Sequence, residues 1–283
     1  NLVKRSSSLR LIMLKLRILT ACIAVPLVWL AIFELPGFTF SIIAMLFMLF
    51  AAYEWSVLVG DITWRFRILF SLAIVITIIA SAYSMWVACV LLSLALIVWV
   101  WLSVAVIVFQ KKSSPFGLES YVLRAMMGWV VLSAGWLSLT VMRVHPGVGP
   151  RWLLYACMLA WVVDTGAYFA GHAFGSHFLA SRVSPKKTWE GFWGGMLAAV
   201  ILIIIANFFL PHLSGHRVLF VVVSLLAAIV SVFGDLSISV MKRLVQVKDT
   251  GSFFPGHGGV LDRIDSLLPV LLLFASAAVF LNL

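Results

Sequence analysis

The chain has 283 residues, of which 64% are hydrophobic and only 11% are charged, and its mean hydropathy is +1.15. Apolar stretches long enough to cross about 30 Å of hydrocarbon recur along the whole length, which excludes a soluble domain and a soluble domain with a single anchor. The formal net charge of +10 shows that cations outnumber anions, so their placement carries information about orientation.

The apolar stretches predict an all-α integral membrane protein, a polytopic bundle of about nine transmembrane helices. Strands of a membrane barrel would alternate apolar and polar residues, and 91–109 and 218–232 do not. The expected spans are roughly 11–33, 38–59, 66–83, 85–109, 123–142, 152–174, 191–211, 217–241 and 261–282. The first stretch is basic and then apolar, like a signal peptide, but its length favours a retained helix.

The twenty Lys and Arg residues predict a cytoplasmic N-terminus. With that orientation all but three of them, Arg143, Arg151 and Arg217, fall on the cytoplasmic side. Such a face would attract anionic headgroups and polyphosphate ligands alike. Because topology already accounts for the cations, no nucleic-acid partner is expected. The short N-terminus, with no targeting presequence, favours the plasma (inner) membrane of a bacterium.

The acidic residues divide the chain unevenly. Residues 1–150 are expected to form a transmembrane scaffold of about five helices, and 151–283 a catalytic region of about four, without being independent domains. Four acidic residues of the first part are expected to be solvated or interfacial, at span ends or in loops: Glu34, Glu54, Asp61 and Glu119.

Two carboxylates, Asp164 and Asp235, lie within otherwise apolar helices. An intramembrane carboxylate costs about 3 kcal/mol even on insertion scales, so each should face a cavity, a partner or an ion. For Asp164, a structural salt bridge remains an alternative to a functional role. Gly171 and Gly175 follow on the same helix face, and their spacing of four favours close helix packing.

The segment SPKKTWEG, residues 184–191, resembles a helix entry. Either Ser184 or Thr188 could cap the exposed N–H groups, which would leave a positive helix end beside Lys186 and Lys187. This arrangement predicts a phosphate site. The alternative is an ordinary basic cytoplasmic loop.

The segment before the last apolar run mixes cations, carboxylates and glycines, and positive-inside bias explains only the cations. Asp262 and Asp265 are three residues apart and can face one side, and Asp235 could approach them from the preceding helix. Mg²⁺ typically joins one or two carboxylates to substrate phosphates. Nearby Lys and Arg would hold the remaining phosphate oxygens, which is typical of phosphoryl or nucleotidyl transfer. His257 is either a general base or a hydrogen-bonding residue in a glycine-flanked turn.

The run S-x-x-K-R-x₄-K-D-x-G-x₂-F-P-x-H-G-G-x-x-D-R-x-D, from Ser239 to Asp265, resembles the signature of the phosphatidate cytidylyltransferases. The upstream runs DTGAYFAG and SPKKTWEGFWGG, between Asp164 and Gly195, are also similar to that family. Together they cover about the last 120 residues closely. The first 150 residues are similar to the family only as hydrophobic spans.

The resemblance implies a membrane enzyme that transfers CMP from CTP to phosphatidic acid, giving CDP-diacylglycerol and pyrophosphate with Mg²⁺. It also implies K⁺ beside the Mg²⁺ and a homodimer. The implied metal ligands are Asp235, Asp262 and Asp265. The catalytic candidates are these three with Lys248, Arg263 and His257. The substrate-binding candidates are Ser184, Lys186, Lys187, Thr188, Ser239, Lys242, Arg243, Asp249, Gly258 and Gly259.

Two other functions compete with this interpretation. An ion or anion transporter would also have many spans and buried carboxylates, but transporters usually place such charges at the midplane and show internal repeats, which this sequence lacks. A transferase that uses CDP-alcohol lipids would carry the tandem pattern D-G-x₂-A-R followed by G-x₃-D-x₃-D, which does not occur here.

Overall fold

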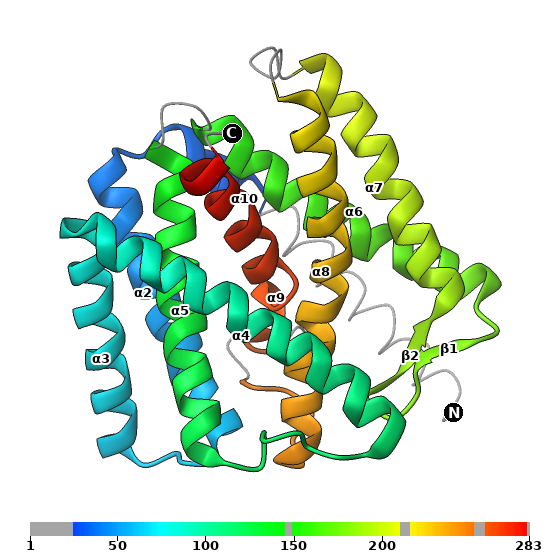
Figure 1. The fold of residues 1–283 in the computed structure, drawn as a ribbon, viewed down its shortest axis with the longest axis horizontal. Helices are drawn as coiled ribbons and strands as arrows, with labels where there is room; N and C mark the ends of the chain where they lie inside the picture. The colour runs from blue at the N-terminus through cyan, green and yellow to red at the C-terminus, as the bar shows by residue number, and fades with distance from the viewer. Residues whose placement is uncertain (1–24, 145–148, 210–215, 252–257, 282–283) are drawn as a thin grey trace, which may run out of the picture.

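The computed structural model describes residues 25–144, 149–209, 216–251 and 258–281, and its architecture is a helical bundle with one small hairpin (Figure 1). The elements in chain order are α2 (Gly37–Val59), α3 (Trp64–Tyr83), α4 (Met85–Lys112), α5 (Tyr121–Val144), α6 (Gly149–Phe174), β1 (Phe178–Ala180), β2 (Ser184–Thr188), α7 (Trp189–Phe209), α8 (Arg217–Leu244), α9 (Leu261–Ile264) and α10 (Leu267–Leu281).

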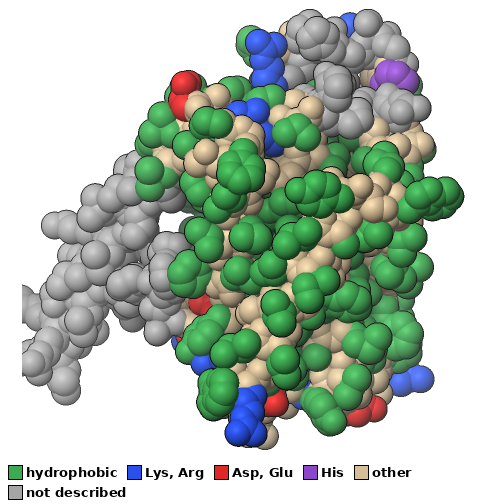
Figure 2. Space-filling model, turned by 90° about the vertical axis from the view of Figure 1, so that its left-hand side faces the viewer, with side chains coloured by type: hydrophobic (Ala, Val, Ile, Leu, Met, Phe, Trp, Pro, Cys, Tyr) green, Lys and Arg blue, Asp and Glu red, His purple; other side chains and the backbone are tan. Residues whose placement is uncertain are grey.

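Within the described part of the chain, 7 helices are long and apolar enough to cross a membrane, α2 to α8. They coincide with seven of the spans expected from the sequence, and they confirm a polytopic helical membrane protein. Figure 2 shows hydrophobic side chains over the middle of one face, with charged side chains gathered toward its two ends. Most of the first expected span, 11–33, lies outside the described residues, and 25–33 are helical.

The expectation of one continuous last helix, 261–282, is wrong. The segment forms the four-residue helix α9 and the fifteen-residue helix α10. Between them the backbone N–H of Ser266 donates to Oδ1 of Asp265 over 2.8 Å, a local side-chain bond that competes with the helical pattern. Pro269 follows in the first turn of α10, where no intrahelical donor is needed. Asp265 therefore lies at a helix junction.

The central helix of the bundle is α5, which lies between α2 and α10 (Figure 1) and is buried along most of its length. The indole N–H of Trp55 donates to the carbonyl of Arg124 over 2.9 Å. Arg124, one of the cations assigned to the cytoplasmic side, is buried. Its guanidinium donates to the carbonyls of Leu118 and Val59 over 2.6 and 2.8 Å, so it satisfies the C-terminal end of α2.

Helices α6 and α7 form an antiparallel pair along one side of the bundle (Figure 1). Small residues allow their close approach: a Cβ on Gly171 would lie 3.1 Å from Oγ1 of Thr188, and one on Gly166 would lie 2.7 Å from Cβ of Ala198. The expected packing role of Gly171 is therefore confirmed.

The connection between α6 and α7 is a two-stranded antiparallel sheet that the sequence did not predict. Phe178 pairs with Thr188, and Ala180 pairs with Ser184. Of the two alternative caps, Ser184 begins β2 and lies too far from α7, which starts at Trp189, to cap it. Thr188 is the cap, since its Oγ1 accepts from the N–H of Gly191 over 3.1 Å. The hairpin carries Lys187 to the face of α8.

Candidate active site

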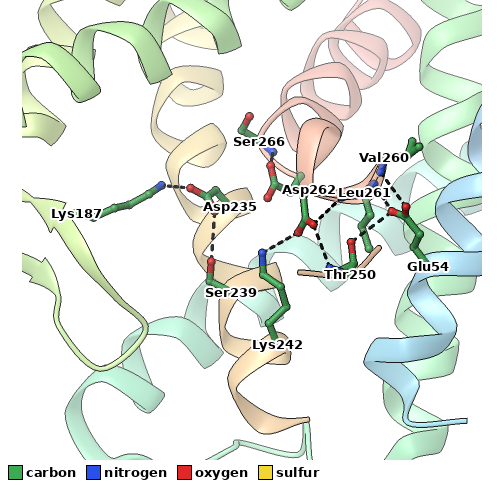
Figure 3. Close-up of polar contacts among 12 residues, drawn as sticks. Glu54, Lys187, Asp235, Ser239, Lys242, Thr250, Val260, Leu261, Asp262 and Ser266 are labelled. Atoms are coloured by element: carbon green, nitrogen blue, oxygen red, sulfur yellow. Dashed lines mark hydrogen bonds and ion pairs between the residues drawn. The ribbon is translucent and has the colours of Figure 1, made fainter. Parts of the chain in front are cut away.

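Asp235 lies on α8 within reach of the hairpin. The ammonium group of Lys187, on β2, is 2.5 Å from its Oδ2, and the Ser239 hydroxyl donates to Oδ1 over 3.3 Å (Figure 3). Burial alone would lower the pKa of Lys187, but the adjacent Asp235 carboxylate raises it above its usual value. The lysine is therefore charged and neutralises Asp235.

Asp262, on α9, is held by three donors (Figure 3). Nζ of Lys242 lies 2.8 Å from Oδ1, and Oδ2 accepts from the backbone N–H groups of Thr250 and Gly259 over 3.0 and 3.1 Å. Burial would raise the pKa of Asp262, but Lys242 and the two N–H groups lower it below its usual value. The carboxylate is thus ionised and paired.

Gly258 has a backbone conformation that few side chains tolerate, with φ of 81°. A Cβ there would lie 3.0 Å from Oδ2 of Asp262 and 3.6 Å from Oδ1 of Asp249. The glycine therefore lets the chain pass between two carboxylates. Asp249 itself is exposed at the edge of this cluster.

The junction between α9 and α10 connects the cluster to α6. Asp265 is buried, and the hydroxyl of the adjacent Ser266 donates to Oδ2 of Asp164 over 3.0 Å. The expectation that Asp164 faces a partner is confirmed, and its partner is a hydroxyl. No salt bridge of Asp164 occurs among the described residues.

Glu54 was expected to be solvated, and this expectation is wrong. It is only 6% exposed, on α2, and accepts from the Thr250 hydroxyl and from the backbone N–H groups of Val260 and Leu261 over 3.3, 3.0 and 2.8 Å (Figure 3). A glutamate near a span end gives no sequence signal for a partner some two hundred positions away. The only sequence feature that could have indicated burial of Glu54 is its position next to Trp55, which is also buried in α2.

Several predicted site residues lie outside the lysine–aspartate pairs. Nε of Arg243 donates to the carbonyl of Val183 over 3.1 Å, which ties α8 to the hairpin. Three other cations are exposed to solvent, Lys186, Lys248 and Arg263. His257 lies outside the described residues.

The carboxylates fit a divalent cation that completes its shell with substrate oxygens. In the described part of the chain no three His, Cys, Asp or Glu side chains form a ready-made ligand set. Asp235 and Asp262 are each paired with the ammonium group of one lysine. Since Mg²⁺ commonly takes only one or two carboxylates and otherwise binds water and phosphate, this donor set is adequate.

Comparisons with known proteins agree with the signature. The sequence profile of the cytidylyltransferase family matches residues 15–281. The phosphatidate cytidylyltransferase of Pseudomonas aeruginosa is 33% identical over 264 residues, 93% of this chain and 96% of the relative. That of Staphylococcus haemolyticus is 33% identical over 91% of this chain and 96% of the relative. That of Haemophilus influenzae is 40% identical over 60% of this chain and 62% of the relative.

Proposed function

Since the chain belongs to the cytidylyltransferase family, we propose that it is a phosphatidate cytidylyltransferase whose active site is the cluster around Asp235 and Asp262. It transfers CMP from CTP to phosphatidate and releases pyrophosphate. The observation that carries the assignment of the site is the pair of lysine–carboxylate contacts, Lys187 with Asp235 and Lys242 with Asp262, on neighbouring elements.

The reaction needs little acid–base chemistry. An oxygen of the phosphatidate monoester, already an anion, attacks the α-phosphorus of CTP, and the bond from that phosphorus to the bridging oxygen breaks, so that pyrophosphate leaves. Catalysis then depends on positioning and on neutralising phosphate charge. Lys187 and Lys242 supply cations next to the carboxylates, and they can transfer their hydrogen bonds to phosphate oxygens when substrate binds.

Asp235 and Asp262 would be the principal ligands of the Mg²⁺ that the resemblance implies, and Asp265, buried beside them, would support the same centre. When bound, the metal ion supplies charge neutralisation to the triphosphate and to the departing pyrophosphate. The backbone N–H groups of Thr250 and Gly259 hold Asp262 in one orientation before any ligand arrives. The implied K⁺ and the implied homodimer stay predictions.

The outlying candidates have supporting roles in this proposal. Lys186, Lys248 and Arg263 are exposed, so they can contact substrate phosphates or lipid headgroups without first breaking an ion pair. Asp249, separated from Asp262 by Gly258, lies close enough to support the same cation site. His257 keeps its two proposed roles, proton transfer or hydrogen bonding to phosphate.

The proposed topology has nine spans, a cytoplasmic N-terminus and an active site that faces the cytoplasm of a bacterial inner membrane. The asymmetry of Lys and Arg supports this orientation. A site at this boundary can admit a water-soluble nucleotide from one side and a lipid headgroup from the bilayer. The transport alternative is weaker, because Asp164 and Asp235 are held by Ser266 and Lys187 at one polar cluster.

The proposal is tested by following the α-phosphate of CTP. Purified protein in mixed micelles receives CTP labelled at the α-phosphate, phosphatidic acid and Mg²⁺, and label in extracted lipid is compared with pyrophosphate release. Equal amounts of both, dependent on both substrates, support the activity. Diacylglycerol in place of phosphatidic acid is the matched control, because it lacks the attacking phosphate. Folded protein that labels no lipid would contradict the proposal.

A further inference from the structure

We propose that Glu54, on α2, is a positioning residue for the reaction: its buried carboxylate fixes the backbone that holds Asp262. The proposal rests on the proposed function, since it assigns Asp262 to the active site. Residues 1–150, which were expected to be a scaffold only, would then help to organise the active site through Glu54. Figure 3 shows Glu54 on the opposite side of Asp262 from Lys242.

Both carboxylates are bound by the same two short segments. Thr250 donates its hydroxyl to Glu54 and its backbone N–H to Asp262. On the other segment, the N–H of Gly259 donates to Asp262, while those of Val260 and Leu261 donate to Glu54. Any shift of Glu54 therefore moves the groups that orient Asp262.

The glycines of the signature fit the same explanation. A Cβ on Gly251 or on Gly259 would overlap the carboxylate of Glu54. Neither glycine has a positive φ, so backbone strain does not account for them. The close approach of the chain to Glu54 explains both glycines, because it leaves no room for a side chain at either position.

A purely structural role explains these contacts less well. A buried carboxylate is costly, and well-packed apolar residues usually stabilise a protein as much or more. The cost is offset here by three donors that converge on one side chain. Such an arrangement selects one backbone geometry, and geometry is what the transfer reaction needs: a misplacement of about 1 Å can reduce turnover about a hundredfold.

The test compares Glu54→Gln, Glu54→Asp and Glu54→Ala with wild type, and Glu119→Gln is the matched control at an exposed position. Gln offers one acceptor oxygen where two are used, and its amide group would face N–H donors. We expect kcat to fall about a hundredfold for Gln and Ala, with the KM for CTP changed less than about threefold. Asp keeps the charge and both oxygens and should recover part of kcat.

A second measurement reports on the backbone without turnover. Hydrogen exchange of the amides of Val260 and Leu261 should accelerate in Glu54→Gln, while exchange in α5 stays as in wild type. A third measurement compares kcat in Gly259→Ala alone and combined with Glu54→Ala. The added Cβ should lower kcat when Glu54 is present, because it overlaps the Glu54 carboxylate. It should lower kcat little further in Glu54→Ala, where that carboxylate is missing.

The outcomes separate this inference from the proposed function. If wild type transfers no CMP, the proposed function fails, and the exchange data still decide whether Glu54 orders the segment. If wild type is active and Glu54→Gln keeps its kcat, the positioning role is wrong. An equal loss in all variants that follows only a loss of folded protein would also overturn it, as would full additivity of the Gly259→Ala and Glu54→Ala effects.

Discussion

Lys242→Met should destabilise the protein by removing the cation that neutralises Asp262. The two side chains are largely buried, with exposures of 13% for Lys242 and 6% for Asp262, and lie 2.8 Å apart. Removing one partner of a buried pair commonly costs about 3–5 kcal/mol. Asp262 keeps its hydrogen bonds from Thr250 and Gly259, so we expect a smaller loss, about 2–3 kcal/mol.

The assay is thermal unfolding in detergent, with and without Mg²⁺. A loss of this size lowers the Tm by about 4–8 °C in a chain of this length. Mg²⁺ should restore much of the Tm in Lys242→Met and change wild type less, because a divalent ion can replace the missing cation. Lys112→Met, at an exposed position on α4, is the control and should leave the Tm unchanged.

Either of two results would contradict this prediction for Lys242. A Tm of Lys242→Met equal to that of wild type would mean that the ion pair contributes nothing in solution. A Tm that falls but does not respond to Mg²⁺ would mean that Asp262 does not bind the ion in the absence of nucleotide.

Two further predictions concern the bundle that carries the site. Arg124→Met leaves the carbonyls of Leu118 and Val59 without their donors and should cost about 2–4 kcal/mol, measured as a lower Tm in detergent; an unchanged Tm would contradict the buried position. Gly194→Ala places a Cβ against Ala170 and should separate α6 from α7 at a cost of about 1–3 kcal/mol by the same assay, whereas a stable variant would show that the helices are not in close contact.

Local patterns made most of the helices predictable. Long apolar stretches gave α2 to α8 within a few residues, because bilayer thickness sets helix length independently of tertiary packing. The break between α9 and α10 could not be found in this way. It depends on the hydrogen bond from the N–H of Ser266 to Asp265, at the polar start of the last apolar run, where periodicity gives no boundary. The hairpin of β1 and β2 was missed because its strands are too short for a periodic signal.

The candidate site was predictable in its second half and missed in its first. Asp235 stood out because charge in an apolar helix is costly, and Asp262 because positive-inside bias does not explain the carboxylates of its segment. The structure gives each of them a lysine partner. Glu54 did not stand out, because a carboxylate near the end of a span is usually solvated. Its importance appears only through tertiary contacts with Val260 and Leu261, which no local spacing encodes.

Whether the cluster around Asp235 and Asp262 is the active site can be measured as CMP transfer by Asp235→Asn and Asp262→Asn, with Asp61→Asn as a loop control. Loss of residues that merely support a metal ligand commonly costs about 10–100-fold, so loss of a ligand itself should cost more. We expect folded variants whose lipid labelling falls by more than about a hundredfold for Asp235→Asn and Asp262→Asn and stays normal for Asp61→Asn. Near-normal labelling by folded Asp262→Asn would contradict the assignment of the active site.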